Sequence, residues 1–297
     1  MSYAQSFGQP ASASSRLCST LLLVVSACGG SPPTDSQGTL QPLPGSARVF
    51  DVHGRPAGAV PIESLQVDRL TVLPLAEGAL AAVHHGRLGG SSVYRVRNNE
   101  VTTLFETAPE EPITGMVGHA GGEGLAYVVR KPPAWTGVPG RSALQFRGEL
   151  WLRDASNTAA RASIEDDAAR PLGWLGDRLV YTRYLPGDLP EQRPFLLDTA
   201  TGRSRAIVVE ESHAYGFELI GTRLVYAASD DPIVTMPAPN QVVRVVSFDL
   251  TERRRDVVAV VRGDLPGSFY ARGESQLGYV LEGAGSRRVV DLETGAV

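Results

Sequence analysis

The sequence predicts an all-β domain made of repeated antiparallel units, and three observations support this prediction. A short apolar strand pattern recurs along the chain, a polar turn pattern accompanies it, and no stretch of ten or more residues shows a clear 3.6-residue apolar period. The chain has 297 residues, of which 42% are hydrophobic and 20% are charged. That length and composition are sufficient for one large β domain or two smaller ones.

The first repeated unit is an apolar strand centred on a leucine. Its five copies have leucines that are separated by 45, 54, 45 and 53 residues, namely Leu80, Leu125, Leu179, Leu224 and Leu277. The third and fourth copies, at 176–181 and 221–226, are almost the same sequence, with Gly, Arg, Leu, Val and Tyr at matching positions. Chance does not explain this agreement, so we expect five strands in equivalent places of a repeated structure.

The second repeated unit is a strand that runs into a polar turn and then into another strand. Its clearest copies are at 197–202, 248–252 and 290–295, with a looser copy at 96–100. Asp, Asn, Thr and Gly favour tight reversals because they tolerate positive φ or bond their own backbone. Each copy is therefore predicted to be a β-hairpin, and each period contains about four short strands.

Four antiparallel strands repeated every 40–55 residues are typical of a β-propeller blade. Five first units predict five blades, with six if an N-terminal hairpin belongs to a further blade; a long β-sandwich is the alternative fold. The last repeat stops after its third strand, and 48–54 matches a second unit without a first unit before it. We therefore expect a strand within 47–62 to pair with the strand at 287–292 and close the ring.

These strands and hairpins carry a resemblance to a known group of proteins. The Gly-x-x-Leu-x-Tyr strands and Asp-x-x-Thr-Gly hairpins, spread over 47–297, resemble the propellers of TolB-like periplasmic proteins and of prolyl-oligopeptidase N-terminal domains. The resemblance implies a propeller fold. It implies much less about function, because one fold hosts many functions.

The N-terminal segment predicts export. Arg16 precedes an apolar run of 11 residues, 17–27, which is shorter than the roughly 20 residues of a transmembrane helix and is typical of a secretory signal. Val25-Ser26-Ala27-Cys28 resembles the lipobox of bacterial lipoproteins, which implies cleavage before Cys28 and attachment of two or three acyl chains to it. The alternative is an ordinary signal peptide with an incidental cysteine.

The predicted organisation is a signal peptide at 1–27, a flexible tether at 28–46 and a propeller domain at 47–297. The tether is rich in Gly, Pro and Ser, and an extended chain of this length reaches about 50–60 Å. Gly29 stands where an inner-membrane retention signal often has Asp, so by family analogy the outer membrane is favoured. We expect an envelope protein that is a monomer and is held on the membrane through lipid on Cys28.

Composition excludes several chemistries. After removal of 1–27, which hold Arg16 and no acid, 27 basic and 32 acidic residues leave a net charge of −5, which argues against a nucleic-acid partner. The two cysteines are Cys18 and Cys28, so the exported body has none for zinc or nucleophilic catalysis. No serine-hydrolase elbow or phosphate loop is present, and we expect no cofactor.

The remaining candidate groups are histidines and paired acids. The five histidines do not form a recognised metal spacing, and His84 and His85 are adjacent strand residues that point to opposite faces, so no metal site is predicted. Asp166-Asp167 and Asp230-Asp231 are carboxylates for calcium or for sugar hydrolysis, or simply solvated turn residues. A glycosidase-like enzyme with carboxylates in the central pocket is therefore the alternative function.

The longest insertions are predicted to share one face. They lie between the second and third strands of three repeats, at 131–145, 185–193 and 229–240, where a propeller places equivalent loops together. Our leading hypothesis is a non-catalytic binding or scaffolding protein that uses this face for a protein, peptide or glycan. The alternative is tolerated surface insertions. The predicted face contains Lys131, Trp135, Arg141, Tyr184, Asp188, Asp230, Asp231 and Met236.

Overall fold

The computed structural model describes residues 44–63, 67–85, 89–119, 124–138, 141–154, 160–161, 167–185, 191–232, 240–272, 275–281 and 283–294. These residues form β-strands joined by turns and short segments, without a helix, so none of them supplies an apolar helix long enough to cross a bilayer. The strands are β1 (Pro44–Phe50), β2 (Pro56–Glu63), β3 (Val67–Leu75), β4 (Gly78–His85), β5 (Ser91–Arg97), β6 (Glu100–Glu106), β7 (Ile113–Gly118), β8 (Gly124–Val138), β9 (Arg141–Asp154), β10 (Ala160–Arg161), β11 (Ala168–Leu175), β12 (Arg178–Tyr184), β13 (Gln192–Asp198), β14 (Arg203–Ala206), β15 (His213–Ile220), β16 (Arg223–Ser229), β17 (Val242–Asp249), β18 (Arg255–Arg262), β19 (Pro266–Ala271), β20 (Gln276–Leu281) and β21 (Ser286–Asp291).

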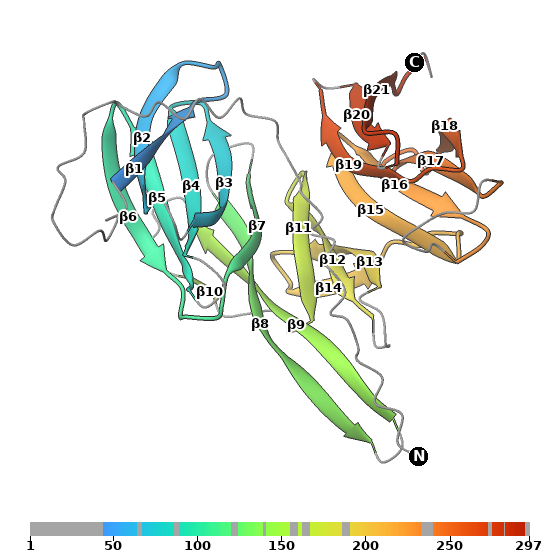
Figure 1. The fold of residues 1–297 in the computed structure, drawn as a ribbon, viewed down its shortest axis with the longest axis horizontal. Helices are drawn as coiled ribbons and strands as arrows, with labels where there is room; N and C mark the ends of the chain where they lie inside the picture. The colour runs from blue at the N-terminus through green and yellow to red at the C-terminus, as the bar shows by residue number, and fades with distance from the viewer. Residues whose placement is uncertain are drawn as a thin grey trace, which may run out of the picture.

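The strands form a series of antiparallel sheets, which confirms the predicted propeller architecture (Figure 1). The sheets β3–β6, β7–β10, β11–β14 and β15–β18 each have four strands, and β19–β21 has three. The five predicted first units are β4, β8, β12, β16 and β20, the second strand of each sheet. The first strands contact one another in order from β3 to β19, so the sheets follow each other radially in chain order.

The predicted ring-closing pairing is wrong for the described residues. β1 pairs with β2, from Pro44 opposite Glu63 to Phe50 opposite Pro56, while β21 pairs with β20. A short turn closes this local hairpin at little entropic cost, whereas pairing with β21 would close a very long loop. The hairpin instead packs on β4 and β5 of the first sheet, as Figure 1 shows. The number of blades stays a prediction. Gly45 and Ser46, which were assigned to the tether by their composition, belong to β1.

The core lies between neighbouring sheets. Each apolar cluster mixes residues of two successive sheets, or of the hairpin and the first sheet, and the second strands are covered on both faces. On β12, for example, Leu179, Val180 and Tyr181 are all fully buried although consecutive side chains point to opposite faces. The recurring Leu-Val-Tyr pattern therefore reflects strands that are sandwiched between two neighbours.

The hairpins predicted at 96–100, 197–202 and 248–252 form, whereas 290–295 gives a turn without a following strand in the described residues. Asn98 and Asn99, both at positive φ, make the first of these turns, and an aspartate shapes the others. The side chains of Asp51, Asp198, Asp249 and Asp291 each accept hydrogen bonds from two backbone N–H groups two to four residues ahead, at 2.8–3.0 Å. For Asp198 and Asp291 these bonds are the leading cause of a lowered pKa. The second repeated unit is thus a turn that bonds its own backbone.

Candidate functional site

The first insertion is an extended hairpin, which corrects the prediction of a loop at 131–145. Beyond Lys131 and Arg147, β8 and β9 continue to pair from Ala134 opposite Gln145 to Val138 opposite Arg141. In Figure 1 this hairpin projects away from the sheets, and we call residues 132–146 the arm. Pro132 and Pro133 predict a loop, but they fall at a register shift between Lys131 and Ala134, where proline is tolerated because the ladder is interrupted.

The other predicted face residues are only partly brought together. Tyr184 ends β12 and is half-buried; burial raises its pKa, while the charge of Arg130 on β8 opposes the rise, so the two residues are close. Asp230 is exposed and its carboxylate binds Arg244 at 2.6 and 3.0 Å, and Asp231 is exposed beside it. Trp135 and Arg141 lie on the arm, where the strands but not the side chains are described. Asp188, Met236 and Cys28 lie outside the described residues.

Acidic residues in the segments between sheets reinforce this face. Four of these segments carry an acid that bonds to the second strand, or to the turn after it, of the sheet that follows. The contacts are Glu111 with Lys131 on β8 at 2.8 Å, Asp167 with Arg183 on β12 at 2.7 Å, Glu211 with Tyr226 on β16 at 2.9 Å, and Asp264 with the N–H groups of Gly283 and Ala284 after β20 at 2.7 and 3.0 Å. The sheets therefore share a recurring polar contact as well as a recurring strand pattern.

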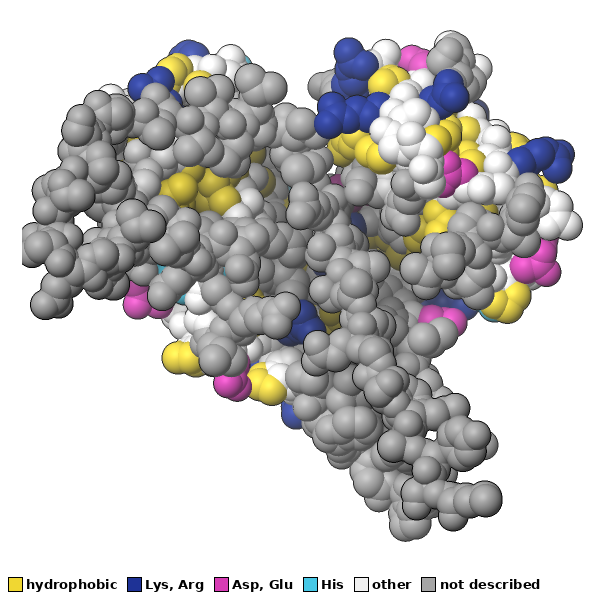
Figure 2. Space-filling model, in the orientation of Figure 1, with side chains coloured by type: hydrophobic (Ala, Val, Ile, Leu, Met, Phe, Trp, Pro, Cys, Tyr) yellow, Lys and Arg dark blue, Asp and Glu magenta, His cyan; other side chains and the backbone are white. Residues whose placement is uncertain are grey.

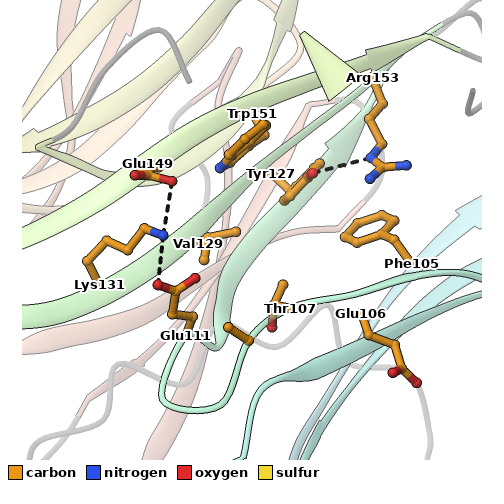
Figure 3. Close-up of a pocket in the computed structure, with 11 residues that line it drawn as sticks. Phe105, Glu106, Thr107, Glu111, Tyr127, Val129, Lys131, Glu149, Trp151 and Arg153 are labelled. Atoms are coloured by element: carbon orange, nitrogen blue, oxygen red, sulfur yellow. Dashed lines mark hydrogen bonds and ion pairs between the residues drawn. The ribbon is translucent and has the colours of Figure 1, made fainter. Parts of the chain in front are cut away.

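A depression of about 220 Å³ lies between the β3–β6 and β7–β10 sheets, at the base of the arm (Figure 3). One wall comes from the end of β6 and the segment after it, and the other comes from β8 and β9. The lining residues are Phe105, Glu106, Thr107, Ala108, Glu111, Tyr127, Val129, Lys131, Glu149, Trp151 and Arg153. Charged groups stand at its two ends, and apolar side chains lie between them.

Lys131 forms one end of the depression together with two carboxylates. Its Nζ donates to Glu111 Oε1 at 2.8 Å and lies 3.1 Å from Glu149 Oε2. All three side chains are between 22% and 26% exposed, so the cluster is shielded but reachable. Burial alone would lower the pKa of Lys131, but hydrogen bonds and charge from both glutamates outweigh it and raise the pKa.

Arg153 forms the other end among aromatic rings. Its guanidinium carbon lies 3.9 Å from the centre of the Phe105 ring, a cation–π contact, and its Nε donates to the hydroxyl of Tyr127 at 3.2 Å. The Phe105 and Tyr127 rings are 4.9 Å apart. Burial raises the pKa of Tyr127, and the Arg153 charge works against it. The two charged ends flank Val129 and Trp151.

Sequence reasoning identified only Lys131 among these residues. A signal for part of the set is present, because Glu149, Trp151 and Arg153 alternate with the buried Leu150 and Leu152 along β9, so the three share one face. Their placement opposite Glu111 follows from how two sheets pack, which local sequence does not encode.

The first strands of two neighbouring sheets carry a separate charged pair. Arg170 Nη2 on β11 lies 3.2 Å from Glu218 Oε2 on β15. Burial raises the pKa of Glu218, and Arg170 opposes this by its charge and its hydrogen bond. Among the side chains described on β3, β7, β11, β15 and β19, Glu218 is the one carboxylate. Sugar hydrolysis uses two carboxylates about 5–10 Å apart, and this part of the structure supplies one.

The adjacent histidines point to different partners, as predicted. His84 Nδ1 lies 2.7 Å from Ser91 Oγ, and His85 Nε2 lies 2.7 Å from Ser92 Oγ. Ser92 also donates to Glu106 Oε1 at 3.1 Å, so serine stands between histidine and carboxylate. A catalytic triad needs histidine in the middle. Within the described residues, no group of three or more His, Cys, Asp or Glu side chains could hold a metal ion.

No protein-family model and no curated protein matches the chain. Among solved structures, it is similar to TolB from Acinetobacter baumannii, with a TM-score of 0.53, 11% identity, and coverage of 84% of this chain and 58% of TolB. It is also similar to an oligogalacturonate lyase in complex with manganese, with a TM-score of 0.57, 13% identity, and coverage of 84% and 69%. For a putative TolB from Agrobacterium tumefaciens the values are 0.50, 11%, 84% and 85%.

These likenesses define a class of fold. At 11–13% identity they show a TolB-like β-propeller, which confirms the resemblance carried by the repeated strands and hairpins. The chain spans less than two thirds of the Acinetobacter protein's length, and the similar structures include both TolB and a lyase. Function must therefore be argued from this chain's own sites.

Proposed function

We propose that this chain is a lipid-anchored, non-catalytic binding protein of the bacterial cell envelope, with the outer membrane favoured, and that the face carrying the arm binds a protein, peptide or glycan. The observation that carries the proposal is the arm. Beyond Arg130, β9 is the one strand that pairs with β8 in the described residues. An isolated two-stranded hairpin is marginally stable in water, so a partner on the arm gives it a physical purpose.

The surroundings of the arm support the same proposal. The depression at its base offers aromatic and charged groups that are partly exposed, and Arg130 and Tyr184 place the next sheet's second strand close to the base. In the space-filling view, the described surface carries side chains of both signs (Figure 2). Specific contacts, rather than a single-sign field, would then select the partner.

Shortening the arm tests the binding face. Joining Lys131 to Arg147 through Asn-Gly keeps the register of β8 and β9 and supplies a tight hairpin turn. We expect the full chain to capture a partner from envelope extracts and the shortened chain to lose it. The matched control is Glu252→Gln, an exposed residue of the β17–β18 turn at the opposite ends of the strands. Unchanged capture by the shortened chain would contradict the proposal.

Incorporation of labelled palmitate tests the anchor. The wild-type chain should take up label in a bacterial host, and Cys28→Ala should abolish it, because Cys28 supplies the thiol that the lipobox resemblance marks for acylation. Equal labelling of the two chains would sink the lipid assignment.

The competing function, a carbohydrate-active enzyme with carboxylates in the central pocket, has one supporting observation, the raised pKa of Glu218. A general acid at neutral pH needs such a rise. Release of reducing ends from polysaccharides by the wild-type chain, lost in Glu218→Gln with the fold retained, would replace the binding proposal.

A further inference from the structure

We infer that the depression at Lys131 binds one sugar ring of an uncharged glycan. The inference rests on the proposed function and narrows its ligand to one class. Three features lead to it: an aromatic surface, neighbouring hydrogen-bond donors and acceptors, and, at the Lys131 end, an ammonium that is already paired with two carboxylates of the protein.

The apolar part of the depression suits the C–H face of a sugar ring. Trp151 lines the depression and is half-buried, and Val129 lies beside it. The Arg153 guanidinium covers Phe105, and Tyr127 is buried. Trp151 packs on the core but stays partly exposed, so it is the aromatic side chain of the depression that a ligand can reach. A flat ring with apolar faces and polar edges packs on indole through its faces and keeps its edges for hydrogen bonds.

The polar end suits hydroxyl groups. An ammonium has three donors, and Lys131 directs two of them at Glu111 and Glu149. Each carboxylate has a second oxygen and further lone pairs with which to accept bonds. A hydroxyl both donates and accepts, so two adjacent hydroxyls can bridge the ammonium and a carboxylate at once.

The paired charges argue against an ionic ligand. A cation would have to compete with Lys131 for Glu111 and Glu149, and an anion would approach two carboxylates that already hold the ammonium. An uncharged polyhydroxyl ring adds hydrogen bonds without breaking the pairs.

The size of the depression sets the length of ligand that it encloses. Pockets for drug-sized ligands have volumes of about 300–1,000 Å³, and this one measures about 220 Å³. It therefore holds one ring, and the remaining units of a glycan would lie on the surface near the base of the arm.

The test is calorimetric titration of the full chain with neutral tetrasaccharides of glucose, mannose, galactose and N-acetylglucosamine. The charged ligands for comparison are tetragalacturonate, a lysine-rich peptide and a glutamate-rich peptide. We expect at least one neutral sugar to bind. Trp151→Ala and Glu149→Gln should each weaken it about tenfold or more, while Trp151→Phe, which keeps a ring, should weaken it less. Thermal unfolding of each variant controls for folding.

Other outcomes separate the two proposals. Three results would each overturn the glycan assignment: no neutral sugar binds, a charged ligand binds more tightly than the neutral sugars, or sugar binding survives Trp151→Ala and Glu149→Gln. Partner capture that still depends on the arm would leave the proposed function standing. Partner capture that is unchanged when the arm is shortened, together with sugar binding that depends on Trp151, would overturn the proposed face and leave the sugar site.

Discussion

Two polar clusters are built on equivalent glutamates, each two residues before the first strand of its sheet, in the second and fourth four-stranded sheets, and they differ in burial. In both, a glutamate from the segment before the sheet bonds to the sheet's second strand. The exposed fraction of the Glu211 side chain is 5%, against 26% for both glutamates of the other cluster. The clusters are Glu111, Lys131 and Glu149 in one and Glu211, Tyr226 and Arg255 in the other.

The difference shows how one repeated contact can serve two purposes. Where neighbouring chain covers the acid, as at Glu211, the contact lies inside the fold and stabilises it. Where the neighbours leave a depression, the same kind of contact becomes the wall of a binding site. Burial, rather than residue type, separates the two, and stability measurements can test this.

Glu211→Ala should have the largest effect. It leaves the buried hydroxyl of Tyr226 and the partly buried Arg255 without their carboxylate, and breaking such a pair from one side costs about 3 kcal/mol. The free energy of unfolding from urea titration measures it. Glu210→Ala, at the exposed neighbouring position, is the control and should change stability by about 0.5 kcal/mol or less. Equal losses would break the comparison.

Lys131→Met should have a smaller effect on stability. The two glutamates it releases are about a quarter exposed and can be hydrated, so we expect a loss of about 1 kcal/mol. The affinity for the neutral sugar should fall by more than the loss of stability alone would explain, because the variant lacks the ammonium donor of Lys131. A loss as large as that of Glu211→Ala would mean that both clusters are structural.

At alkaline pH, wild type and Tyr226→Phe should differ in how steeply their stability falls with pH. Burial, with Glu210 nearby, raises the pKa of Tyr226 to about 12. The unfolded value is about 10, so the stabilisation is present below pH 10 and is lost as the pH rises towards 12. Urea midpoints between pH 9 and 11.5 should fall less steeply for Tyr226→Phe than for wild type. Parallel slopes would contradict this assignment.

Much of the fold could be predicted because its signals are local and repeated. The leucine-centred strands mark β4, β8, β12, β16 and β20, and the aspartate turns mark the ends of β13, β17 and β21. Strand alternation and turn chemistry act between neighbouring residues, so they are visible in the sequence.

Two predictions about strand pairing failed, one for the insertion at 131–145 and one for the N-terminal strand. The repeat predicted a loop at 131–145, but flanking pairs extend β8 and β9 through it, with Pro132 and Pro133 at an interruption of the ladder. A strand within 47–62 was predicted to pair with the strand at 287–292 and close the ring, but β1 and β2, which cover most of this range, pair with each other instead. The second failure follows from the low cost of closing a short turn.

The sequence by itself determined the strand repeat, the turn aspartates and the cysteine that the lipobox resemblance marks at Cys28, because each depends on residues close together in the chain. Only the tertiary structure decided where the N-terminal hairpin packs and which side chains line the depression. Glu111 and Glu149 are far apart in sequence: the pairing of β9 with β8 brings Glu149 to Lys131, and the packing of the segment before β7 against the sheet that follows brings Glu111. Contacts of that kind depend on how whole sheets stack, and no single stretch of residues encodes them.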